Sequence, residues 1–156
     1  MVNDCHRYCF LFATIHSTVA KLFGPCYNIR GDGMKENVLI GKSIDFGARI
    51  VRLYRYLTDT KHETVLSKQV LRSGTSIGAN INEAQYGNSK ADFIAKLHIA
   101  LKETAETEYW LHILQKSEYL DNTMASSMLD DCLAIKRILI ASINTAKDSK
   151  SGDAEA

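Results

Sequence analysis

The sequence predicts an all-α fold, an antiparallel up-and-down four-helix bundle. Four segments after residue 33 repeat apolar side chains at spacings of three, four and seven residues, the period of an amphipathic helix. The connections between these segments are short and carry helix start and stop signals, which favours antiparallel neighbours. The only proline, Pro25, precedes all four segments, so no proline interrupts a helix.

The composition is typical of a globular domain, with 46% hydrophobic and 24% charged residues in a chain of 156. A net charge of +1 does not favour binding to nucleic acid by bulk charge. No apolar run reaches the roughly 20 residues that a membrane-spanning helix needs. We therefore expect one cytoplasmic domain without membrane contact.

Residues 1–33 differ from the rest of the chain and are expected to be a leader, either disordered or outside the functional domain. They contain three of the four cysteines and no sustained helical period. Two alternatives stay open, a secretory signal built on the apolar run 9–15 and a metal site. The metal site would use Cys5, Cys9, Cys26 and either His6 or His16. We favour a leader, because a polar lead-in and a clean helix follow Met34 directly, and a chain starting there should keep the full helical content.

The first helix is expected over residues 43–57, with Ser43 as its N-cap. Its apolar stripe consists of Phe46, Ile50, Leu53 and Leu57. The densest basic run of the chain lies off this stripe and supplies the candidate nucleic-acid-binding residues, Lys42, Arg49, Arg52 and Arg55. The alternative is an ordinary solvated surface, since Asp45 can pair with Arg49 one turn later.

The second helix is expected over residues 61–86, from a capping box of Thr60 and Glu63 to a C-terminal Gly87. Its predicted inner face carries Leu66, Val70, Ser73, Ile77, Asn80, Ile81 and Ala84. Gly74 and Gly78 lie on one flank of this face, where each glycine costs roughly 1 kcal/mol relative to alanine. We expect a neighbouring helix to pack closely over them, which makes this the central helix of the bundle.

The third helix is expected over residues 90–117, antiparallel to the second because the connection is so short. Its predicted inner face carries Phe93, Leu97, Leu101, Thr104, Glu108 and Leu111. The candidate interhelical polar residues are Arg72, Ser76, Asn80, Glu83, Glu103 and Glu108. Glu108 needs a partner or a proton in such a stripe, and Arg72 should pair with Glu103 or, one turn along, with Glu106.

Tyr109, Trp110 and Leu114 lie off the predicted stripe of the third helix and are the candidate oligomer interface. The fourth helix is expected over residues 124–147, after a cap at residues 121–123. The bundle should therefore span residues 34–147, followed by a disordered polar tail, 148–156.

The sequence contains no phosphate-binding, dinucleotide-binding, zinc-protease or nucleophile-elbow motif. A di-iron bundle would require two E-x-x-H repeats, whereas only Glu108 and His112 approach that pattern, at a spacing of four. We therefore expect no catalytic residue, metal, cofactor or small-molecule substrate.

The chain resembles the bacterial four-helix bundle proteins, also called S23 or 23S rRNA intervening-sequence proteins. The matching strings are RSGTSIGANINEAQ (72–85), SKADFIAKLHIALKE (89–103), ETEYWLHIL (106–114) and CLAIKRILIASINTAK (132–147). The resemblance implies an antiparallel bundle in a ring-like homopentamer, without enzymatic activity. It also implies RNA or an RNA-handling partner, such as a reverse transcriptase. The alternative is a structural protein-binding scaffold that does not contact nucleic acid.

Overall fold

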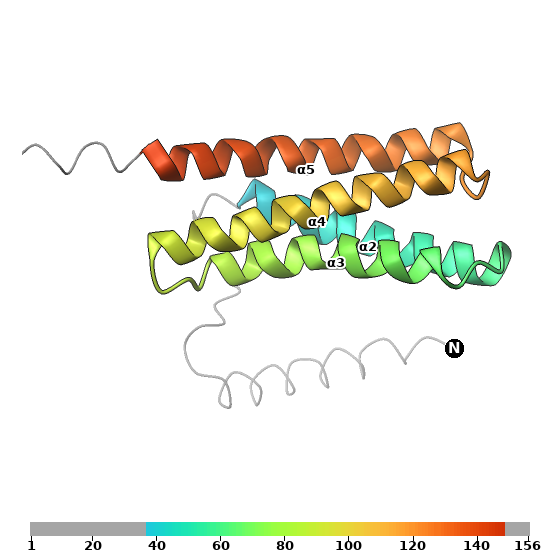
Figure 1. Cartoon of the computed structure of the whole chain (residues 1–156), viewed down its shortest axis with the longest axis horizontal. Helices are drawn as coiled ribbons and strands as arrows, with labels where there is room; N and C mark the ends of the chain where they lie inside the picture. The colour runs from blue at the N-terminus through green and yellow to red at the C-terminus, as the bar shows by residue number, and fades with distance from the viewer. Residues whose placement is uncertain (1–36, 149–156) are drawn as a thin grey trace, which may run out of the picture. The chain divides into compact units, whose positions relative to one another are not determined.

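The structure is a computed structural model that describes residues 37–148, in which four long helices follow one another (Figure 1). They are α2 (Val38–Arg55), α3 (Leu66–Ala84), α4 (Lys90–Lys116) and α5 (Asn122–Asp148), with one π-helical turn, η1 (Tyr56–Thr60), after α2. No strand occurs among these residues, so the predicted all-α class is confirmed. The expected leader, the metal and signal alternatives within it, and residues 149–156 of the expected tail lie outside the described residues.

The helices run up and down, each antiparallel to the one before it (Figure 1). α3 packs against α2 and α4, and α5 packs against α4 and α2. The contact between α3 and α4 is the most extensive, whereas α2 and α5 touch least. The fold is therefore the predicted four-helix bundle, with a tight α3–α4 side and a looser α2–α5 side.

The core is a column of side chains that are each at most 6% exposed, contributed by all four helices and by the turns that follow α2 and α4. Its members are Leu39, Phe46, Ile50, Leu53, Leu57, Val70, Ile77, Ile81, Ala84, Leu97, Ala100, Leu111, Leu114, Leu120, Ala125, Met128, Cys132, Ile135, Leu139 and Ile143. Burial of these apolar groups, at about 25 cal/mol for each Å² removed from water, is the main force holding the helices together.

α2 begins five residues earlier than predicted, because Asn37 and not Ser43 is the N-cap. The Asn37 side chain accepts a hydrogen bond from the Leu39 N–H at 3.1 Å. Ser43 is only 3% exposed, and its hydroxyl donates to the Ile40 carbonyl at 2.8 Å. The prediction was wrong because serine, although common at N-caps, can also lie inside a helix when its hydroxyl donates to a backbone carbonyl of the preceding turn.

The predicted capping box between the first two helices is also wrong. Thr60 ends the η1 turn, and His62 has a left-handed backbone, with φ of 55°, which interrupts the helix before α3. Glu63 caps α3 instead, since its carboxylate accepts hydrogen bonds from the N–H groups of Val65, Leu66 and Ser67 at 2.6–2.8 Å. α3 therefore starts at Leu66, five residues later than expected.

The α3–α4 connection is two residues longer than predicted, because the second helix was expected to reach residue 86. Helix α3 ends at Ala84, and the Gly87 N–H donates to the Ala84 carbonyl at 3.1 Å. A Cβ on Gly87 would lie 3.1 Å from the Phe93 nitrogen, so glycine is required by space and not as a left-handed C-terminal residue. The predicted start of α4 is confirmed, because the Ser89 hydroxyl accepts from the Asp92 N–H at 3.1 Å.

The two glycines of α3 lie where α2 crosses it, as expected. A Cβ on Gly74 would be 2.7–2.9 Å from three side-chain carbons of Ile50. One turn later, a Cβ on Gly78 would meet Ser43 at 3.5 Å. These contacts run in opposite directions along the two helices, which fixes the antiparallel register of α2 and α3.

Candidate functional site

Two ion pairs close the outer side of the α3–α4 seam. Arg72 donates to Glu106 at 2.8 Å, and Lys96 donates to Glu83 at 2.5 Å. The predicted contact of Arg72 with the third helix is thus present, although with Glu106 and not Glu103. The hydrogen bond to Glu83 raises the pKa of Lys96. Because both pairs are largely exposed, they fix helix register more than they add stability.

A buried hydroxyl pair, which sequence reasoning missed, joins the same two helices. The Thr107 hydroxyl lies 3.0 Å from the Ser73 hydroxyl, and both residues are fully buried. Ser73 also donates to the Gln69 carbonyl of its own helix at 3.1 Å. The signal was present in the sequence, since a serine on an apolar face requires a polar partner from the facing helix.

Three of the predicted interhelical polar residues do not bridge helices in this way. Asn80 donates to the Ser76 carbonyl within α3, at 2.8 Å. One carboxylate oxygen of Glu103 is buried and has no hydrogen-bond partner among the described residues. The predicted interhelical contacts of Ser76, Asn80 and Glu103 are therefore not present among the described residues, whereas those of Arg72 and Glu83 are.

Glu108 links α4 to α5 and not to α3. Its carboxylate accepts from the Lys136 ammonium at 2.6 Å, with side chains 23% and 32% exposed. The prediction that this carboxylate needs a partner is confirmed, whereas its place in the middle of the buried stripe is not. Thr107 and Leu111 hold the buried positions on either side of it.

The aromatic pair of α4 is ordered by its neighbours. Trp110 donates its indole N–H to Glu106 at 3.2 Å and packs partly buried against the core. Tyr109 meets the Trp110 ring edge-on, with centroids 5.1 Å apart, and is 57% exposed. Leu114, by contrast, is fully buried in the core, so its assignment to an oligomer interface is wrong. The α4 aromatic face is accordingly Tyr109 with the outer edge of Trp110.

The predicted basic run on α2 is divided by the structure. Arg49 turns toward α5, where it pairs with Asp131 and donates to the Ser127 hydroxyl at 2.8 Å. The other three members are exposed, and none has an ion pair within residues 37–148; they are Lys42, Arg52 and Arg55. Arg49 is thus a structural residue of the α2–α5 seam, because its guanidinium is already used within the bundle.

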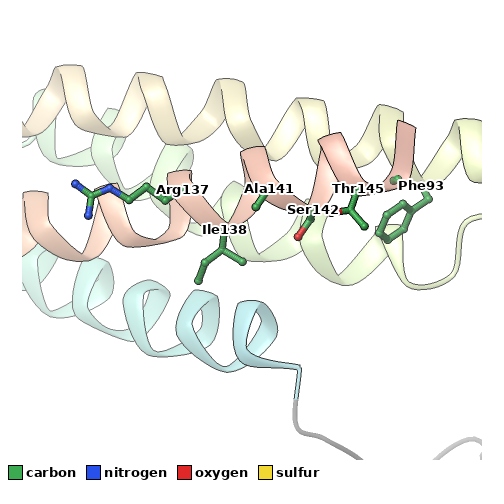
Figure 2. A pocket seen from close by; sticks show the side chains of 7 residues that line it. Phe93, Arg137, Ile138, Ala141, Ser142 and Thr145 are labelled. Carbon is green, nitrogen blue, oxygen red and sulfur yellow. The ribbon is translucent and has the colours of Figure 1, made fainter. Parts of the chain in front are cut away.

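An open groove of about 650 Å³ lies along the end of α5, bordered by Phe93 of α4 (Figure 2). Ile138 points toward the first turns of α2, and Arg137 lies at one end of the row (Figure 2). The remaining lining residues are small, namely Ala141, Ser142, Thr145 and Ala146. This lining includes no carboxylate, imidazole or thiol, so the groove offers apolar contact and two hydroxyls but no acid–base pair.

Cys132 is the one cysteine in the described part of the chain and is not reactive. It is fully buried, and burial raises the pKa of its thiol to about 12. A thiol in this environment is neither a nucleophile nor a metal ligand at neutral pH. Residues 37–148 also contain no group of His, Cys, Asp or Glu side chains that could hold a metal ion. None of their helices is long and apolar enough to cross a membrane.

Fold and surface together define an up-and-down helical bundle with an extensive α3–α4 contact and an aromatic pair on α4 of which Tyr109 is exposed. The family described as the 23S rRNA-intervening sequence protein matches residues 35–141, and the chain belongs to this family. The resemblance found in the sequence is thereby confirmed.

Among solved structures, the chain is similar to a protein with unknown function from the S23 ribosomal protein family of Bacteroides thetaiotaomicron VPI-5482. The two are 52% identical, and the match covers 68% of this chain and 98% of that one, with a TM-score of 0.68. No curated protein matches the chain.

Proposed function

We propose that this protein is a non-enzymatic interaction module that assembles with copies of itself through the α4 aromatic face. The observation that carries the proposal is Tyr109, a large side chain that is 57% exposed although its ring is held against Trp110. An ordered aromatic side chain contributes a large contact area and loses little rotamer freedom on binding. Tyrosine and tryptophan are accordingly enriched among residues that dominate binding energy.

The Trp110 side of this face is preorganised. Glu106 accepts from both Arg72 and the Trp110 indole, so the rotamer of Trp110 is fixed from the α3 side. A surface that is rigid before binding avoids part of the entropic cost of association. A homopentamer is the assembly that we propose, on the basis of the family resemblance.

The test is the mass of the full chain in solution by light scattering. Tyr109→Ala should reduce the oligomer mass or raise its dissociation constant by about tenfold or more, as expected for a central aromatic contact. Tyr86→Ala is the matched control, because Tyr86 is also an exposed tyrosine, 80% exposed beyond the end of α3, and should not change the mass. A wild-type monomer at micromolar concentration would refute the proposal.

A second candidate function is contact with RNA or with an RNA-handling partner such as a reverse transcriptase. The family description and the exposed cations Lys42, Arg52 and Arg55 support it. The internal use of Arg49 weakens it, since a cation held within the bundle cannot neutralise a phosphate. A structural scaffold that binds only protein remains the alternative.

A further inference from the structure

The outward side of the α2–α3 layer is apolar, although nothing in the bundle covers it. Ile44 and Val51 of α2 are 60% and 37% exposed and lie seven residues apart on one flank of the helix. Leu71 of α3 is partly buried; the register set by the contact of Gly74 with Ile50 brings it near the level of Val51, and Thr75 follows it one turn later. We call these four residues, with Gly47, the outer α2–α3 face.

Gly47 lies between Ile44 and Val51 in the sequence and contributes no side chain to this face. A Cβ there would have nothing within 4 Å, so no neighbour inside the bundle requires glycine. Gly74 differs, because Ile50 occupies the space of its missing side chain. A glycine inside a helix is destabilising relative to alanine. At Gly47 no contact inside the bundle explains the glycine. The missing side chain does, however, let the backbone of another molecule approach closely between Ile44 and Val51.

One end of the face is basic. The contacts of Gly74 with Ile50 and of Gly78 with Ser43 set the register, which brings Lys68 level with Arg55 beside the η1 turn. Both are exposed, and neither has an ion pair in the described part of the chain. Neither is ion-paired with the nearest carboxylates in the sequence, since Glu63 accepts from the first N–H groups of α3 and Asp59 accepts from the Thr58 hydroxyl.

From this combination we propose that the outer α2–α3 face binds an amphipathic helix of a protein partner with acidic side chains at one end. Ile44 and Val51 are separated by about 10 Å along α2, which matches apolar anchors at i and i+7 on a docked helix. The acidic end of the partner meets Arg55 and Lys68. Aliphatic side chains offer no stacking platform for bases, so this face suits a helix better than single-stranded RNA.

This inference is independent of the proposed self-association. α4 lies diagonally across the bundle from α2, and the two helices are not packing neighbours. Changes on the outer α2–α3 face should therefore leave the α4 aromatic face intact. Failure of either proposal does not remove the other.

The probe is a labelled helical peptide of about five turns, with leucines at i, i+3 or i+4 and i+7, and with glutamates in one terminal turn. A second peptide carries lysines in place of the glutamates. Fluorescence anisotropy with the full chain should show at least about tenfold tighter binding of the acidic peptide. The double variant Arg55→Glu, Lys68→Glu should reverse this preference.

Gly47→Leu should weaken peptide binding by about tenfold or more, because its side chain fills the space between Ile44 and Val51. Gly41→Leu is the matched control, since a Cβ on Gly41 also meets nothing within 4 Å but lies one turn before Ile44, outside the interval between Ile44 and Val51, and its binding should stay at the wild-type level. Circular dichroism should show both variants folded, as expected where a leucine replaces a glycine in open space.

Four results would overturn the proposal. The first is equal binding of the two peptides, or binding of neither at millimolar concentration. The second is an equal effect of the two glycine variants. The third is a change in oligomer mass in Gly47→Leu with unchanged peptide affinity, which assigns the face to a second copy. The fourth is displacement of the peptide by single-stranded RNA that depends on Arg55 and Lys68, which assigns the face to nucleic acid.

Discussion

At the start of α3, the Glu63 carboxylate accepts hydrogen bonds from three backbone N–H groups that have no partner within the helix. Burial alone would raise the pKa of Glu63, but the hydrogen bonds from the Leu66, Ser67 and Val65 N–H groups together lower it below the ordinary value of 4.5. A pKa that is lower in the folded than in the unfolded chain means that the ionised cap stabilises the fold. This stabilisation is complete at neutral pH and is lost as the pH falls below 4.5 and through the folded-state pKa.

We therefore expect Glu63→Ala to cost about 1–2 kcal/mol at neutral pH, the usual effect of losing a helix cap. The difference in thermal midpoint between wild type and variant should shrink as the pH is lowered, since wild type also loses the ionised cap. Thermal denaturation across an acidic pH series measures this. Asp130→Asn, at an exposed position of α5, is the control and should show almost no difference at any pH; a Glu63→Ala difference that is constant with pH would contradict the assignment.

Two glycines make a matched pair for the packing argument. Gly74→Ala should destabilise by about 1–3 kcal/mol through overpacking, because the new Cβ would lie 2.7 Å from Ile50. Gly47→Ala should stabilise by up to about 1 kcal/mol, since the helix gains propensity and the Cβ meets open space. Urea denaturation measures both. Ile50→Val should partly rescue Gly74→Ala, and stabilisation by Gly74→Ala alone would show that α2 does not approach so closely.

At the scale of helices, the α2–α5 seam depends on one side chain more than the other seams do. α2 and α5 have the least extensive contact of the neighbouring pairs, and Arg49 supplies bonds to Asp131 and to both oxygens of Ser127. Arg49 is therefore expected to contribute to folding, although the basic run to which it belongs lies off the apolar stripe of α2.

Arg49→Gln should cost about 0.5–2 kcal/mol, the range of a partly exposed charge-assisted hydrogen-bond network. Arg52→Gln should change stability by less than about 0.5 kcal/mol, because Arg52 is exposed and has no ion pair within residues 37–148. Chemical denaturation of the two variants gives the comparison. Equal stability losses would mean that the contacts of Arg49 with α5 do not persist in solution.

The number and order of the helices, and most of their inner faces, could be predicted because the spacing of apolar residues along the sequence determines them. Helix starts could not, since Ser43 and Thr60 have the side chains of caps, while Asn37 and Glu63 occupy the cap positions. The start of α3 depends on the left-handed backbone at His62, which no local sequence pattern predicts.

The candidate site was predicted only in part for a similar reason. The predicted stripe of α4 was drawn at a nearly fixed angular position, but the buried residues of this helix repeat at spacings of three and four, so that their stripe drifts around the helix axis. Leu114 is thereby buried although it lies off the predicted stripe. The partner of Arg49 could not be found either, because it belongs to a helix about 80 residues away whose register was unknown.

For the whole molecule, bulk charge cannot drive RNA binding, since the chain carries a net charge of only +1. If RNA binds, Lys42, Arg52 and Arg55 must supply the local charge, repeated around an oligomer. The triple change of these residues to glutamine, with Arg49 left intact, should lower the salt slope of RNA affinity by about one unit for each phosphate that is no longer neutralised. Equal binding by wild type and variant, or no binding at low salt, would leave the protein-binding scaffold as the function.

Because the chain has a single tryptophan, its tryptophan fluorescence comes from one place. Trp110 lies at the α3–α4 seam, hydrogen-bonded to a carboxylate and touching the tyrosine proposed to meet a second copy. Its emission should therefore shift when α3 and α4 separate, and again when Tyr109 is covered. The protein thus contains an optical reporter that can follow unfolding and assembly without any label.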